Sequence, residues 1–115
     1  MPQVTQDGGV GDLAESGALP TLFKSQERAK IIEAFITNKS RKLNVSDVAR
    51  LSDTSRTTVY EQLARLTELG IVDEVEYGAS TFYTLNEDDE LAETLFKLQG
   101  ITLRRLYELD EETDL

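Results

Sequence analysis

Apolar residues in the middle of the chain recur at the spacing of helices. Val48, Ala49 and Leu51 follow Ser46, a residue type that caps helix N-termini well. Residues 52–55 are all polar and leave room only for a tight corner. The pattern therefore predicts a short helix that is followed at once by a second helix.

The second predicted helix is longer and has a clear apolar stripe. Val59, Leu63 and Leu66 recur at i, i+4 and i+7, as in a helix that packs on a core. Ser55 can cap its start, and Gly70 stands where a helix-ending glycine is expected. A helix presented by a shorter one across a tight turn is typical of a helix-turn-helix, whose second helix enters the DNA major groove.

Two runs rich in β-branched and aromatic residues follow these helices. Residues 71–77 and 81–85 predict two strands, and residues 78–80 predict the hairpin tip between them. Residues 43–45 predict a small strand that pairs with this hairpin. The fold class is therefore mainly α with a small β-hairpin (α+β): a winged helix-turn-helix with an added C-terminal helix.

Helices are also predicted on both sides of this unit. On the N-terminal side, Ser25 can cap a helix that runs to about residue 38. Its inward face is Ala29, Ile32, Phe35 and Ile36. On the C-terminal side, the acidic residues at 87–90 suit a helix N-terminus, which favours negative charge. A calcium site is an alternative interpretation of these acids, but they lack the ligand spacing of a calcium loop.

The apolar residues of the predicted C-terminal helix cover about half of its circumference, more than one domain needs. We expect one line of them to close the core and the other to meet a second copy of the chain. A helix that only closes the core is the alternative. The expected dimer contacts are Leu91, Leu95, Phe96, Leu98, Leu103, Leu106 and Tyr107.

These elements predict a domain organisation in four parts. Residues 1–20, rich in glycine and without sustained periodicity, form a disordered N-terminal arm. Residues 21–86 form the DNA-binding domain, residues 87–109 the dimerisation helix, and residues 110–115 an acidic tail.

The helix-turn-helix region also resembles a known group of proteins. It is similar to the TVxxxLxxLxxxGLV signature of the MarR, ArsR and TrmB-like winged-helix regulators of bacteria and archaea. The residues that carry this resemblance are Thr58, Val59, Tyr60, Leu63, Leu66, Gly70, Ile71 and Val72. The resemblance covers roughly residues 21–86 and implies a DNA-binding transcription regulator.

Two positions depart from that signature. Asp53 replaces the usual turn glycine, which is tolerable because aspartate enters the left-handed backbone region more readily than most residues. The predicted hairpin tip lacks the arginine or lysine that wings of these regulators often send toward the DNA backbone. Docking of the wing on DNA is therefore in question.

The charge of the chain is unevenly distributed. The net charge is −10, which by itself disfavours nucleic acid. Residues 24–65, however, hold nine of the 12 basic side chains and five of the 22 acidic ones, a net charge of +4 that leaves −14 elsewhere. The acidic remainder also resembles proteins of salt-loving archaea, although an acidic protein from an ordinary environment has a similar composition.

Several kinds of chemistry are excluded by composition. The chain has no cysteine and no histidine, so disulfides, thiolate metal sites and the commonest general base are absent. No motif for phosphate binding or nucleophilic catalysis is present. We therefore expect neither an enzyme nor a bound cofactor. No apolar run approaches the ~20 residues of a membrane span, and we expect a soluble, cytoplasmic protein.

The exposed face of the second predicted helix carries the candidate DNA contacts. Arg56 suits base readout because arginine can donate two hydrogen bonds to guanine. Glu61 can accept from cytosine or pair with Arg65. Hydroxyl groups on this helix suit phosphates. So do the three cations of the connector at residues 39–42, although these can equally solvate a loop. The full set is Lys39, Arg41, Lys42, Ser55, Arg56, Thr57, Thr58, Tyr60, Glu61 and Arg65.

Two functions fit these features. The first is a homodimeric, sequence-specific DNA-binding transcription regulator that reads the major groove with residues 55–69. The second is a winged-helix module that binds protein in a transcription or assembly complex, without specific DNA binding. The basic segment and Arg56 favour the first function, whereas Glu61 and the uncharged hairpin tip favour the second.

Overall fold

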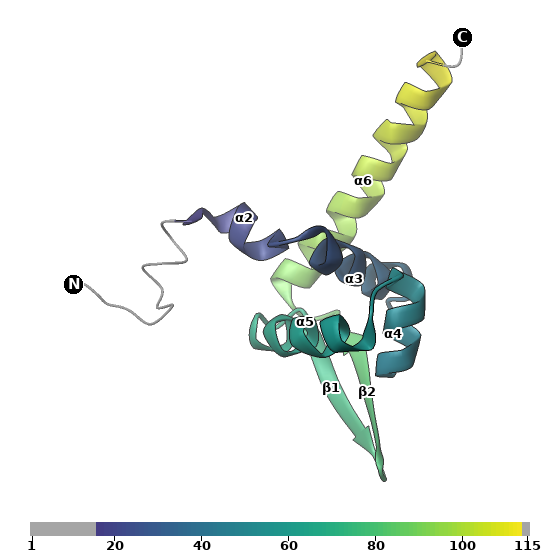
Figure 1. Ribbon diagram of the computed structural model, residues 1–115. Helices are drawn as coiled ribbons and strands as arrows, with labels where there is room; N and C mark the ends of the chain where they lie inside the picture. The colour runs from purple at the N-terminus through teal and green to yellow at the C-terminus, as the bar shows by residue number, and fades with distance from the viewer. Residues whose placement is uncertain (1–15, 114–115) are drawn as a thin grey trace, which may run out of the picture.

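A computed structural model describes residues 16–113 of the chain (Figure 1). It confirms the predicted fold class, mostly helical with a two-stranded antiparallel hairpin and a C-terminal helix. The elements, in chain order, are α2 (Ala18–Phe23), α3 (Gln26–Thr37), α4 (Val45–Ser52), α5 (Arg56–Glu68), β1 (Val72–Tyr77), β2 (Ser80–Leu85) and α6 (Glu90–Thr113).

Helix α4 begins two residues earlier than a Ser46 cap would place it. The side chain of Asn44 accepts a hydrogen bond from the backbone N–H of Asp47 at 2.8 Å, and the Asp47 carboxylate accepts from the Asn44 N–H at 3.1 Å. This reciprocal capping box satisfies two donors at the helix start, so Asn44 is preferred over Ser46 as the cap. The predicted Ser46 cap is therefore wrong.

The turn between α4 and α5 has the predicted conformation. Asp53 lies in the left-handed region, with φ 55° and ψ 48°. Ser55 then caps α5, because its side chain accepts from the backbone N–H of Thr58 at 3.1 Å. At the other end of α5, Gly70 has φ 84°, a conformation that glycine adopts without strain.

The hairpin is regular and its tip is tight. Tyr77 pairs with Ser80, so the connecting loop is Gly78-Ala79 and Ser80 belongs to β2, not to the tip. The small strand predicted at residues 43–45 is reduced to Leu43, which exchanges two backbone hydrogen bonds with Tyr83 at 2.8 and 2.7 Å. Asn44 and the residue after it belong to the start of α4, which shortens this strand.

Both ends of the described range, residues 16–113, are more helical than predicted. Residues 1–15 of the predicted arm lie outside the described residues, but α2 starts at Ala18, so an irregular arm reaching residue 20 is wrong. Its Pro20 is compatible with the first helical turn, where the missing N–H has no helical partner to lose. Helix α6 starts at Glu90, after Asp89 accepts from the Ala92 N–H at 2.9 Å. It continues to Thr113, through most of the predicted tail.

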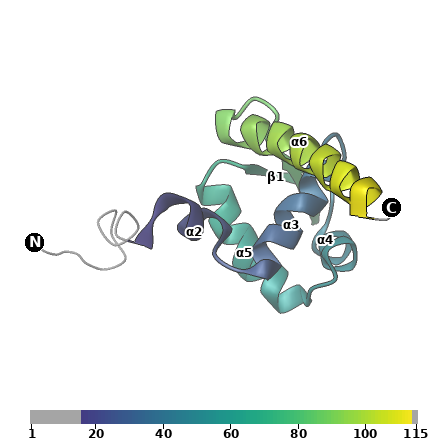
Figure 2. The same cartoon turned by 90° about the horizontal axis from the view of Figure 1, so that it is seen from above.

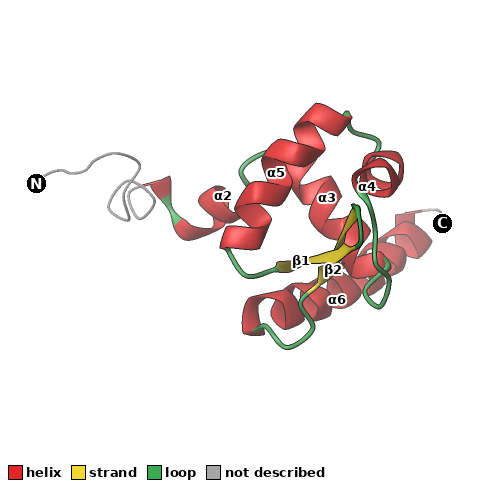
Figure 3. Ribbon diagram, turned by 90° about the horizontal axis from the view of Figure 1, so that it is seen from below, coloured by secondary structure: helices red, strands yellow, loops and turns green. Residues whose placement is uncertain are grey.

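The core lies where α3, α4, α5, the base of the hairpin and the start of α6 meet. In the view from above, α6 crosses over α3 (Figure 2). In the view from below, the hairpin lies between α5 and the start of α6 (Figure 3). The largest fully buried side chains are Phe35, Ile31, Leu43, Leu66, Ile71, Val48, Val59 and Val72. The predicted inward stripe of α5 is confirmed, since Val59, Leu63 and Leu66 are all buried.

Candidate nucleic-acid interface

The first turn of α5 presents the best candidates for DNA contact. Ser55, Arg56 and Thr57 are exposed, and Thr58 is half-buried. The Ser55 hydroxyl donates to the Thr58 hydroxyl at 2.9 Å in addition to capping the helix. The hydroxyls of these two predicted DNA contacts are therefore hydrogen-bonded to each other. Arg56, by contrast, has no hydrogen bond or ion pair with the part of the chain that the structure describes.

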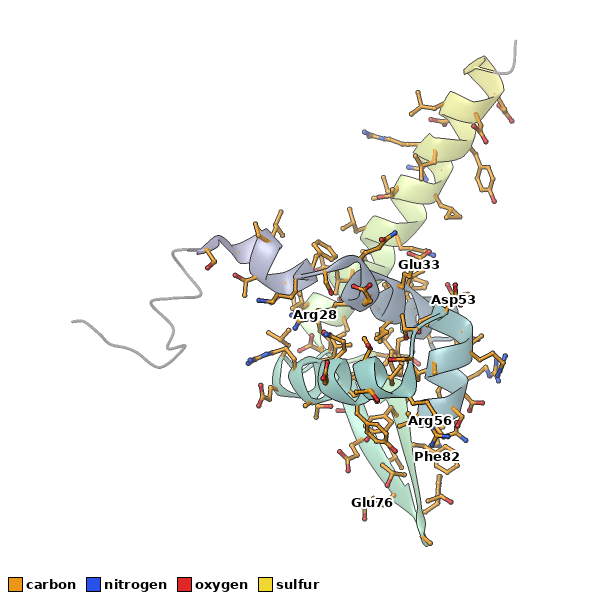
Figure 4. The ribbon with its side chains drawn as sticks, viewed as in Figure 1. Arg28, Glu33, Asp53, Arg56, Glu76 and Phe82 are labelled. Carbon is orange, nitrogen blue, oxygen red and sulfur yellow. The ribbon has the colours of Figure 1, made fainter. Side chains whose placement is uncertain are left out.

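A polar groove of about 370 Å³ runs beside Arg56. It lies between the start of α4, the first two turns of α5 and strand β2, where Figure 4 shows Arg56 and Phe82 near each other. Its polar lining is Asn44, Ser46, Arg56, Tyr60, Ser80, Thr81 and Tyr83, with no carboxylate among the described lining residues. The groove thus combines one free guanidinium with hydroxyl and amide groups, the side-chain types that bind phosphates and base edges.

Further along α5, the charged residues pair differently from the prediction. Arg65 donates to Glu68 at 2.9 Å, not to Glu61. This pair is exposed at both ends, and such surface ion pairs are weak, so Arg65 can exchange Glu68 for a phosphate at little cost. Glu61 and Tyr60 are both exposed.

The three predicted connector cations do not form one surface with α5. The Lys39 ammonium lies 4.1 Å from the centre of the Phe96 ring on α6. Arg41 donates to the side chain of Asn38 at 3.0 Å. The Lys42 ammonium lies 5.4 Å from the Tyr77 ring on the hairpin. Lys42 is therefore the connector cation associated with the wing, while Lys39 belongs to the α6 side.

The hairpin carries negative charge that sequence reasoning did not place. Residues 72–85 contain three acidic side chains and no basic one. Glu74 pairs with Tyr83 and Glu76 with Thr81, so both acids share the hairpin face of Tyr83 and Thr81. The pKa of Tyr83 is raised, chiefly by burial and further by the neighbouring Glu74, Tyr60 and Glu76. Figure 4 shows Glu76 on the side of the hairpin away from Phe82. The sequence signal that could have placed both acids on one face was the alternation of side chains along residues 73–77.

Arg28 of α3 is buried, which sequence reasoning also missed. It is 7% exposed and lies over α5 (Figure 4). Its Nε donates to Gln62 Oε1 of α5 at 2.7 Å, and one terminal nitrogen donates to the carbonyls of Thr21 and Leu22 at 3.1 and 3.3 Å. Burial, and then Arg65, lower the pKa of Arg28. One of the nine cations of residues 24–65 is therefore withdrawn from the surface.

Helix α6 divides the predicted dimer contacts into two groups. Leu95 is buried in the chain's own core and Leu91 packs against it, which confirms that part of α6 closes the core. The other predicted residues are 38–64% exposed: Phe96, Leu98, Leu103, Leu106 and Tyr107. An apolar groove of about 220 Å³ lies between α6 and the residues Phe23, Ile32 and Ile36 of α2 and α3.

Among residues 16–113, no group of three or more Asp or Glu side chains is placed to hold a metal ion. No helix in that range is long and apolar enough to cross a membrane.

Comparisons with known proteins agree with this geometry. A sequence model of the IclR helix-turn-helix domain matches residues 29–76, from α3 to β1. The fold is similar to that of the AntR antimony-specific transcriptional repressor, with a TM-score of 0.63 and 18% identity over 90% of each chain. No curated protein matches the sequence.

Two further solved structures share the fold. One is the homodimeric winged helix-turn-helix DNA-binding domain of a possible ArsR-family regulator from Mycobacterium bovis, with a TM-score of 0.60 and 19% identity over 92% of this chain and 94% of that one. The other is a MarR family regulator from Silicibacter pomeroyi, with a TM-score of 0.58 and 15% identity over 86% of this chain and 74% of that one. The chain therefore has the fold of the winged helix-turn-helix transcription regulators.

Proposed function

We propose that this chain is a homodimeric, sequence-specific DNA-binding transcription regulator. Residues 21–86 form its DNA-binding unit, in which α5 enters the major groove. The exposed side chains of α6 form the dimer contact, so that two copies of α5 reach half-sites about one helical turn apart. A carboxylate-rich surface also suits a protein that works in high salt, such as one from a salt-loving archaeon.

The observation that carries this proposal is the position of Arg56. It stands in the first turn of a well-capped α5, beside a groove without carboxylates, and has no partner among the described residues. The N-terminal residues of a recognition helix are those that reach base edges. Arg56 is thus available to donate to guanine, and Thr57 and Tyr60 are exposed beside it.

A second candidate function is favoured by the acidic hairpin. Glu74 and Glu76 lie on the face of the wing that also carries Tyr83, and both would repel a phosphate backbone. A winged-helix module that binds a protein partner, without specific DNA binding, would have no need of a basic wing.

A binding selection from random duplexes, followed by titration of the enriched and scrambled sequences, separates the two candidates. The regulator predicts an enriched sequence with two related half-sites, bound more tightly than its scrambled form at matched salt. The titration should be repeated from about 0.1 M to molar salt, because phosphate contacts weaken as salt rises. Binding to no duplex at any salt would leave the protein-interaction function.

A further inference from the structure

Arg28 joins three elements of the fold, α2, α3 and α5. Its guanidinium, on α3, donates to no carboxylate among the described residues, and its three hydrogen bonds all go to neutral oxygen atoms. Two of these are carbonyls at the end of α2, and the third is the side-chain oxygen of Gln62 in α5. Burying a charge in this way carries a desolvation cost, so packing alone does not account for the position of Arg28.

The contact with Gln62 has a directional effect that the core contacts lack. Val59, Leu63 and Leu66 hold α5 through apolar burial, which is non-directional and tolerates a small rotation of the helix. A hydrogen bond weakens steeply as its angle departs from linear, so the 2.7 Å bond from Arg28 to Gln62 resists that rotation. Arg56 is on the same helix and must turn with Gln62.

We propose that Arg28 and Gln62 are positioning residues that fix the rotation of α5 about its axis, and so determine how accurately Arg56 meets its base. This inference rests on the proposed DNA-binding function. Arg28 also links the end of α2 to α5 through hydrogen bonds, so α2 is part of the unit that positions the recognition helix. Neither residue is required to touch DNA.

The test is the ratio of affinities for the selected and scrambled duplexes, measured in Gln62→Leu. Loss of the acceptor should lower this ratio about tenfold, the lower part of what one bidentate base contact contributes. Affinity for the scrambled duplex should stay within about twofold, since phosphate contacts carry little sequence information. Gln62→Glu keeps an acceptor for Arg28 and should preserve the ratio.

Gln99→Leu is the matched control. Gln99 of α6 also makes one side-chain hydrogen bond between helices, to Glu33 of α3 at 3.1 Å, but it lies away from α5. The control should leave the ratio unchanged even if it lowers the melting temperature as much as Gln62→Leu does. A purely structural role for Gln62 would give the same unchanged ratio in both variants, and that result would overturn the inference.

A second measurement needs no DNA and keeps the two proposals apart. In two-dimensional NMR spectra of the free protein, Gln62→Leu should shift the amides of residues 56–60, and Gln99→Leu should not. Arg28→Met should additionally shift the amides of α2. Shifts confined to the immediate neighbours of residue 62 would contradict the positioning role, whereas the expected shifts without any duplex preference would contradict only the proposed function.

Discussion

Individual side chains decide where the helices of this small protein begin. Ser25 and Ser55 were predictable as caps, and each accepts a hydrogen bond from a backbone N–H in the structure. The predicted cap of α4 was Ser46, although asparagine is an equally good capping residue and Asn44 stands two residues earlier. The deciding feature is Asp47, three residues after Asn44, which completes the reciprocal pair of bonds.

This cap gives a direct prediction for stability. Asn44→Ala should lower the free energy of unfolding by about 1 kcal/mol, because the backbone N–H of Asp47 loses its side-chain acceptor. Ser46→Ala changes an exposed residue within the same turn and should stay within about 0.5 kcal/mol. Urea denaturation of both variants checks this. Equal losses would show that Asn44 is not the residue that caps α4.

The burial of Arg28 was beyond the reach of sequence patterns. Arginine is mostly exposed in proteins, and a sequence does not show which three oxygens will surround one that is not. The same default counted Arg28 among the cations available for DNA. By contrast, the left-handed conformation of Asp53 was predictable, because the turn between two predicted helices demanded it and aspartate tolerates it.

At the scale of elements, the helices and the hairpin were predictable because their periodicities are clear. The apolar stripe of α5 and the two β-rich runs led to the correct elements within a few residues. The faces of the hairpin were not assigned, because they depend on pairing register. The observed register places Glu74 beside Tyr83 and Glu76 beside Thr81, on one face.

That face predicts an unusual electrostatic effect of the wing. Glu74→Gln combined with Glu76→Gln should strengthen binding to selected and scrambled duplexes about equally, because removing like charge near phosphates acts without regard to sequence. The gain should be several-fold at about 0.1 M salt and vanish near 1 M, where the Debye length falls to about 3 Å. Affinity titrations across this salt range measure it.

Asp73→Asn is the control for this effect. Asp73 is also exposed on β1, but it pairs with Thr84 and points to the opposite face from Glu74. Its neutralisation should therefore have a smaller effect on affinity than Glu74→Gln alone. The same gain from either single change would mean that only net charge matters, and not the face of the wing.

At the scale of the whole molecule, the sequence was sufficient for the fold class but not for the extent of α6. The sequence predicted a dimerisation helix that ends at residue 109 and is followed by an acidic tail, yet α6 continues to Thr113 and leaves five predicted dimer residues 38–64% exposed. Their exposure is what a dimer contact requires before assembly. How much of an amphipathic helix a single chain covers depends on tertiary packing, which periodicity alone does not contain.

This arrangement predicts different effects for substitutions on the exposed and on the buried side of α6. Leu106→Glu with Tyr107→Glu should weaken self-association at least tenfold and leave the fold intact, because both side chains are more than half exposed. Leu95→Glu should unfold the protein, because Leu95 is 4% exposed and a carboxylate there would be buried without a partner. Light scattering and circular dichroism distinguish the two results.

Tyr77→Glu provides the control, since Tyr77 is 56% exposed on the hairpin, away from α6. It should leave self-association unchanged. A folded wild-type protein that is monomeric at micromolar concentration would contradict the dimer.

Base readout by Arg56 is tested most directly by the affinity of Arg56→Ala for the selected and the scrambled duplex at matched salt. The variant should lose about 1–3 kcal/mol of binding free energy on the selected duplex and much less on the scrambled one, with relaxed preference at one base pair per half-site. Equal losses on both duplexes would contradict base readout and make Arg56 a phosphate contact.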